Sequence, residues 1–273
     1  MSGANAAAQR VIMELGIKDP KDLRIIEHVA WARGAQVREA KMTGAEARIV
    51  IHGQQGIITV SSDSHDPCRK RFSIAHELGH FELHRDRSSV SVCLGEDIES
   101  WNGMGATGTG SLEIEANEFA SCILMPEQWF AHDCRSARPS LSIVAGLADK
   151  YMTSLTATAR RYVEFCDDAV AVVFSRGGFI RWFQGSPEFM DCRFFIDPRT
   201  RLSKQTFAGG YFNGAALPTA PRSVFAENWL DKAHPRATII EHSRAMPSYD
   251  AVLSLLWIKD DIMDDDDDLM DEE

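Results

Sequence analysis

The sequence predicts an α+β fold, and three observations support that prediction. Apolar residues recur at helical spacing in four segments, namely residues 6–17, 23–34, 71–84 and 112–125. Two β-branched runs, residues 48–52 and 57–60, flank a short link with a glycine at each end, which is typical of a hairpin. From residue 169 the sequence pattern becomes typical of β-strands, with a turn at Gly177–Gly178.

Local signals set the expected boundaries of several elements. Ser111 is a favourable cap for the helix at residues 112–125, and Pro126 ends that helix. Residues 85–110 show no periodicity and end in a glycine-rich stretch. Residues 139–166 predict two short helices, and residues 251–259 are expected to close the folded body.

The composition excludes several classes of protein. Of 273 residues, 44% are hydrophobic and 25% are charged, which excludes collagen-like, disordered and disulfide-scaffold chains. Ten of the 40 acidic residues lie in the last fourteen positions, Asp260 to Glu273. The rest of the chain carries 30 acidic residues against 29 basic ones, and this near-neutral balance disfavours a dedicated nucleic-acid-binding protein.

The cysteine spacing and the first residues of the chain bear on the expected cellular compartment. None of the six cysteines forms a C-x-x-C pair, and the start of the chain shows no signal-peptide pattern. No stretch of 18 apolar residues is present, so no membrane partner is expected. We therefore expect a cytoplasmic protein with reduced thiols.

An H-E-x-x-H pattern carries the main chemical signal. Residues four apart on a helix share a face, so His76 and His80 can reach one metal ion while Glu77 lies beside it. Imidazoles suit zinc, and a catalytic zinc site needs a third protein ligand.

The next predicted helix offers three glutamates as candidates for that ligand. Glu113 lies roughly 60° from the centre of the apolar face, against roughly 100° for Glu115 and roughly 160° for Glu118. Glu113 is therefore the best candidate, and the other two are expected to be solvated. Asn117, one turn after Glu113, could orient a ligand histidine.

These motifs resemble a known family. Residues 71–80 with Leu83 and His84 resemble the signature of the ImmA/IrrE family of metallopeptidases, and residues 113–126 resemble its second motif. The Glu113-x-x-x-Asn117 element is also similar to the one that completes H-E-x-x-H in thermolysin-like peptidases. The resemblance implies a zincin-like domain and a bacterial or phage zinc protease that cleaves a helix-turn-helix repressor.

The resemblance also implies roles for individual residues. It gives His76, His80 and Glu113 as zinc ligands and Glu77 as the general base, although Mn²⁺ or Fe²⁺ could also occupy such a site. His84, one turn beyond His80, could support the site or contact substrate. The alternative is a histidine favoured near a helix end by the helix dipole.

We expect four parts along the chain. Residues 1–135 form the peptidase domain, 136–167 a helix-turn-helix-like module, 168–259 a mixed α/β region, and 260–273 a disordered acidic tail. Some members of the family carry a GAF-like domain, and by that analogy the C-terminal region is expected to be GAF-like.

The expected function is hydrolysis of a peptide bond in a helix-turn-helix repressor, which relieves repression in a stress response or in a mobile element. One alternative is a non-catalytic, zinc-stapled protein that binds and displaces a repressor. A second is a DNA-binding regulator, but the start of its reading helix, residues 155–158, lacks basic side chains. A G-x-G-x-x-G match at residues 103–108 follows no strand, so we interpret it as a flap rather than as a dinucleotide site.

Overall fold

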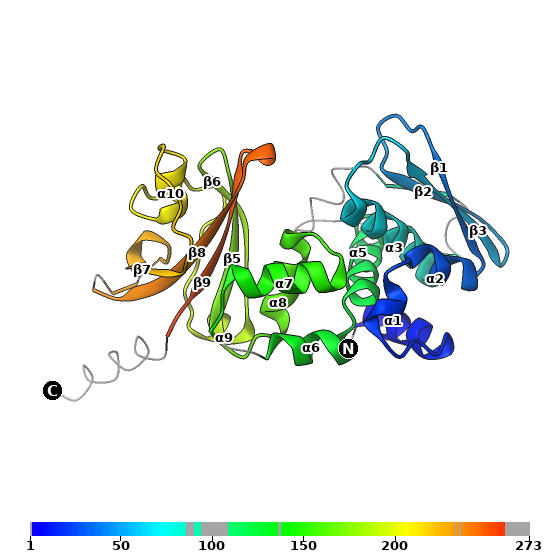
Figure 1. Cartoon of the computed structure of the whole chain (residues 1–273), viewed down its shortest axis with the longest axis horizontal. Helices are drawn as coiled ribbons and strands as arrows, with labels where there is room; N and C mark the ends of the chain where they lie inside the picture. Colours follow the sequence, from blue (N-terminus) through cyan, green and yellow to red (C-terminus); the bar gives the residue numbers. More distant parts are fainter. Residues whose placement is uncertain are drawn as a thin grey trace. The chain divides into compact units, whose positions relative to one another are not determined.

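The computed structural model describes residues 2–85, 90–93, 109–135, 138–231, 233–234 and 236–259. The chain forms two compact units, the first made of Met1–Phe130 with Ala148–Ala157 and the second of Ala131–Leu147 with Thr158–Glu273. The boundaries fall within helices α6 (Glu127–Cys134), α7 (Leu141–Tyr151) and α8 (Leu155–Phe165). The mixture of helices and strands confirms the predicted α+β class (Figure 1).

The first unit contains a four-stranded sheet in the order β1-β3-β2-β4. Its strands are β1 (Ala35–Ala40), β2 (Ala47–His52), β3 (Gln55–Ser61) and β4 (Val90–Cys93). Strands β2 and β3 form the predicted antiparallel hairpin, and β1 runs parallel to β3. Strand β4 was not predicted, because four residues are too few for a pattern and the strand is defined by its pairing with β2.

The helices of the first unit are α1 (Gly3–Glu14), the 3₁₀ turn η1 (Pro20–Leu23), α2 (Ile26–Ala32), α3 (Pro67–His84) and α5 (Thr109–Leu124). Three of them, α1, α3 and α5, begin earlier than the periodicity indicated, whereas α2 is shorter than the predicted segment 23–34. Helix α3 gains a turn because Asp66 accepts hydrogen bonds from the backbone N–H groups of Cys68 and Arg69. Pro126 ends α5 as predicted, and its carbonyl also opens the unpredicted helix α6.

Helix α3 lies inside the first unit, against the sheet and alongside α5 (Figure 1). Its apolar residues Ile74 and Leu78 belong to one buried cluster with Ile49 and Ile58 of the sheet. Because α3 has neighbours on several sides, its polar residues between 73 and 80 are buried as well. A polar group in that interior needs a partner, which makes this helix the place to look for a site.

The second unit contains a five-stranded antiparallel sheet in the order β6-β5-β9-β8-β7. Its strands are β5 (Val170–Arg176), β6 (Phe179–Gly185), β7 (Arg222–Phe225), β8 (Thr238–Met246) and β9 (Ala251–Trp257). Short helices accompany it, namely α9 (Pro187–Asp191), α10 (Phe207–Tyr211), η2 (Ala226–Asn228) and η3 (Pro247–Tyr249). The β5–β6 hairpin turns at Gly177 and Gly178, whose φ angles of 59° and 80° favour glycine.

Several expectations concern parts of the chain that the structure does not describe. The flap predicted at residues 103–108 and the acidic tail predicted at residues 260–273 lie outside the described residues. Among the described residues, the cysteines Cys68, Cys122, Cys134, Cys166 and Cys192 are not paired in disulfides. Within the described part of the chain, no helix combines the length and the apolar character that crossing a membrane requires.

Candidate metal centre

Three potential metal ligands meet between α3 and α5. The Nε2 atoms of His76 and His80 lie 3.1 Å apart. The Glu113 carboxylate spans both rings, with Oε2 3.0 Å from the Nε2 of His76 and Oε1 3.3 Å from the Nε2 of His80. The structure therefore brings together the three side chains that the sequence indicated as ligands.

The spacing of these donors suits one small divalent cation. Ligand atoms in a tetrahedral zinc site lie ~2.0–2.1 Å from the ion, and hence about 3.3 Å from each other. The observed separations of 3.0–3.3 Å between donors on different residues are close to that value. Within the described residues, no other group of three His, Cys, Asp or Glu side chains could hold a metal ion in this way.

The neighbours of Glu113 stabilise its ionised form. Burial would raise the pKa of this carboxyl, but the hydrogen bonds with His76 and His80 outweigh burial and hold the pKa at about 2. The side chain is one-quarter exposed, whereas the two imidazoles are buried. The group that faces a cation is thus a carboxylate held against two ring nitrogens.

Glu77 has a different environment from Glu113. Its side chain is fully buried, and neither carboxylate oxygen has a partner at hydrogen-bond distance among the described residues. Burial, and then the charge of Glu113, raise its pKa well above the usual range, although the backbone of Ile49 partly opposes this rise. A buried carboxyl without partners is costly for folding, and such groups require an explanation in chemistry.

The other ring nitrogen of each histidine is also occupied. The Nδ1 of His76 lies 2.8 Å from the Oδ1 of Asn117, and the Nδ1 of His80 lies 3.1 Å from the Nδ1 of His84. The Nε2 of His84 in turn lies 2.8 Å from a carboxylate oxygen of Glu115. Glu115 has a side chain that is 44% exposed, as expected for a solvated residue, but its angle on the helix did not reveal that it also contacts His84.

Gly79 lets the two helices approach each other closely. A Cβ atom at this position would lie 3.1 Å from both the Cα and the carbonyl oxygen of Ala116, and 3.2 Å from the Cβ of Phe119. Helix α3 is thus in contact with the backbone of α5 at the level of the candidate ligands. The sequence analysis did not identify this role for the glycine of the H-E-L-G-H pattern.

Arg71 fixes the first half of α3. Its guanidinium is buried and donates hydrogen bonds to the carbonyls of Leu23, Tyr151 and Met152. Burial lowers the pKa of this arginine, but the carbonyls at the end of α7 favour the cation through the helix dipole. The helix that carries His76 and His80 is therefore tied to two distant segments of the same unit.

Helix α8 does not have the surface of a DNA-reading helix. The guanidinium of Arg160 lies 3.8 Å from the centre of the Trp182 ring, and Arg161 forms an ion pair with Glu164 at 2.7 Å. Glu164, whose side chain is 37% exposed, is the most exposed residue of this helix, and the other residues of α8 are buried or half-buried. A recognition helix needs exposed basic and amide groups, so the geometry disfavours this alternative.

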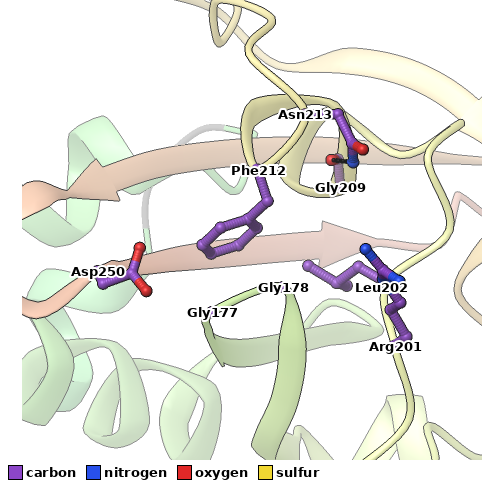
Figure 2. A pocket seen from close by; sticks show the side chains of 8 residues that line it. All are labelled: Gly177, Gly178, Arg201, Leu202, Gly209, Phe212, Asn213 and Asp250. Carbon is purple, nitrogen blue, oxygen red and sulfur yellow. Dashed lines mark hydrogen bonds between the residues drawn. The ribbon is translucent and has the colours of Figure 1, made fainter.

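A separate pocket of about 240 Å³ lies in the second unit. Its lining residues are Gly177, Gly178, Arg201, Leu202, Gly209, Phe212, Asn213 and Asp250. Figure 2 shows Arg201 and Asp250 on opposite sides of the Phe212 ring. The pocket therefore presents one cationic and one anionic side chain, and it shares no residue with the candidate metal centre.

Comparisons with known proteins agree with this geometry. Residues 32–162 match the model of a peptidase family described as the IrrE N-terminal-like domain. Among solved structures, the chain is similar to a Mycobacterium tuberculosis transcriptional regulator, with 14% sequence identity and a TM-score of 0.58. That similarity covers 94% of this chain and 77% of the regulator, and at this identity it shows a shared fold. No match was found among curated proteins.

Proposed function

Because residues 32–162 belong to the IrrE N-terminal-like family of peptidase domains, we propose that this chain is a zinc-dependent metallo-endopeptidase. One observation carries the proposal, namely the buried Glu77 carboxyl that has no hydrogen-bond partner beside the His76–His80–Glu113 cluster. A metal ion that only joined two helices would need the three ligands but not Glu77.

The residues of the site have distinct tasks in this proposal. His76, His80 and Glu113 hold the cation, and Asn117 fixes the orientation of the His76 ring through its Nδ1. When bound, a divalent cation supplies Lewis acidity that lowers the pKa of water and polarises the scissile carbonyl. Zinc is the proposed ion because two imidazoles and a carboxylate are among its preferred ligands.

Glu77 acts as the general base. It accepts a proton from the attacking water at a carboxylate oxygen and delivers it to the nitrogen of the leaving amine. No other side chain engages the oxygens of Glu77 among the described residues, so no side-chain interaction has to break before they accept that proton.

We propose a helix-turn-helix transcriptional repressor as the substrate and the cytoplasm as the location. The motifs of residues 71–84 and 113–126 support this substrate class through their family resemblance. The fold shared with a transcriptional regulator supports a regulatory role in general. The same similarity also favours a second candidate, a regulator that binds a repressor without cutting it.

Intact-mass analysis of a candidate repressor tests the proposal. The repressor is incubated with zinc-loaded wild-type protein and, separately, with Glu77→Gln. We expect two fragments with wild type and none with the variant. A stable complex without fragments, in the presence of bound zinc, would instead support the non-cutting regulator.

A further inference from the structure

A series of hydrogen bonds runs outward from His80. It passes from the Nδ1 of His80 to the Nδ1 of His84 over 3.1 Å, and from the Nε2 of His84 to the Glu115 carboxylate over 2.8 Å. His84 is buried, whereas the Glu115 side chain is 44% exposed. The series therefore connects the interior of the site to a carboxylate at the surface.

The chemistry of imidazole fixes the direction of these hydrogen bonds. A metal ligand at the Nε2 of His80 uses that lone pair, so the ring proton of His80 must be on Nδ1. His80 then donates to His84, which must accept at Nδ1 and carry its own proton on Nε2. That proton is donated to Glu115. Each ring nitrogen of His80 and His84 therefore has a partner, with one donor and one acceptor in each hydrogen bond.

The geometry points to His84 and Glu115 as positioning residues for His80, an inference that rests on the proposed metal centre. His84 accepts the proton of His80 and so fixes the tautomer and the ring orientation that leave the Nε2 of His80 free for a metal ion. Glu115 does the same for His84 and adds a negative charge at the end of the series.

The two ligand histidines are therefore supported differently. His76 donates to the neutral amide of Asn117, whereas His80 donates to an imidazole that is backed by a carboxylate. An acceptor with a negative charge behind it increases the electron density on the donating ring, which strengthens the ring as a ligand. An apolar side chain of similar size could fill the place of His84, but it would leave the Nδ1–H of His80 without an acceptor.

The test measures metal affinity in the full-length chain. Zn²⁺ affinity is obtained by competition with a chromogenic chelator, and the visible absorption of bound Co²⁺ reports the geometry of the ligands. The variants are His84→Leu, His84→Gln and Glu115→Ala, with Glu118→Ala as the matched control. Glu118 lies on the same helix but accepts its hydrogen bond from Ser2. Circular dichroism of the metal-free proteins verifies that each variant folds.

His84→Leu is expected to weaken Zn²⁺ binding by about 10–100-fold and to alter the Co²⁺ spectrum. His84→Gln should recover most of the affinity, because its amide can accept from His80 and donate to Glu115. Glu115→Ala should weaken binding in the wild-type background and have no further effect in the His84→Leu background. Glu118→Ala should match wild type.

Three results would overturn the inference. His84→Leu could bind Zn²⁺ and Co²⁺ as wild type does, Glu115→Ala could have equal effects in both backgrounds, or the wild-type chain could bind neither metal. None of these readouts involves peptide cleavage. Either of the first two results would overturn the positioning roles of His84 and Glu115 and leave the peptidase proposal open. A wild-type protein that binds neither metal would overturn both proposals, whereas a failure to cleave a repressor would leave the positioning roles standing.

Discussion

The two units of this protein each bury a glutamate, and the two glutamates differ in every contact. In the first unit Glu77 is fully buried and neither of its oxygens has a hydrogen-bond partner among the described residues. In the second unit Glu241 is 1% exposed and accepts four hydrogen bonds. Its donors are the backbone N–H groups of Phe207 and Ala208, the indole of Trp229 and the hydroxyl of Ser243.

This difference separates a structural carboxylate from one suited to chemistry. Glu241 joins the start of α10, the residue after η2 and strand β8, so its cost of burial is offset by four bonds that hold the fold. Glu77 makes no comparable set of hydrogen bonds with the described residues of the first unit. A group that weakens the fold in this way is expected where a reaction needs a free proton acceptor.

The largest expected effect is on catalysis at Glu77. Glu77→Gln should lower the rate of repressor cleavage by about 10²–10⁴-fold, because the amide cannot accept a proton. Its stability should be close to that of wild type, since a buried amide without partners replaces a buried carboxyl without partners. Cleavage assays and thermal unfolding of the same samples measure both quantities. Wild-type activity in the variant would exclude Glu77 as the base.

At Glu241 we expect a loss of stability without an effect on the metal site. Glu241→Gln should lower the free energy of unfolding by about 1–3 kcal/mol, because an amide NH₂ group replaces one acceptor and faces donors. Zn²⁺ affinity should not change. Urea unfolding monitored by tryptophan fluorescence provides the first value and chelator competition the second. An unchanged midpoint would show that the four hydrogen bonds do not stabilise the unit.

Gly79 allows a test of the contact between α3 and α5. Gly79→Ala should lower stability and weaken Zn²⁺ binding, because overpacking costs about 1–3 kcal/mol and exceeds the gain in helix propensity of about 1 kcal/mol. Gly146 is the control, since a Cβ there meets no atom within 4 Å. Gly146→Ala should raise the melting temperature. If both variants gained stability, the close approach of the helices would be wrong.

The smallest expected effect concerns pH and the second unit. His242 accepts a hydrogen bond from the backbone N–H of Leu141, and burial, followed by the charge of Arg244, lowers its pKa in the folded state. The unfolded chain therefore binds a proton at His242 more readily than the folded chain does. Neutral His242 thus contributes to the free energy of unfolding above about pH 6.5, and this contribution is lost as the pH falls below that value. His242→Asn, which can still accept at Oδ1, should reduce the loss of melting temperature between pH 7.5 and 5.5. An identical pH dependence in both proteins would contradict this assignment.

The part of the site that follows from helix geometry could be predicted from the sequence. The four-residue spacing of His76 and His80 fixes their common face, and the apolar phase of α5 distinguishes Glu113 from Glu118. The β2–β3 and β5–β6 hairpins were also predicted, because each has glycines between two runs of strand-forming residues. In each case the informative residues are close together in the sequence.

The remainder depends on contacts between distant segments. Glu115 lies at the border of the apolar face of α5, so only the position of His84 on another helix reveals its role. Strand β4 exists through its pairing with β2. The four donors around Glu241 come from three separate segments, and no periodic pattern relates them to one another.

The absence of one methyl group at residue 79 has a consequence for the choice of metal. Because Gly79 lies against the main chain of Ala116 with no Cβ between them, no rotating side chain sets the separation of α3 and α5 at this level. Ions that need bonds of about 2.3–2.6 Å, as calcium does, would require one helix to move away from the other. At the observed helix separation, the spacing of the donors thus favours a small ion before any ligand has exerted its chemical preference.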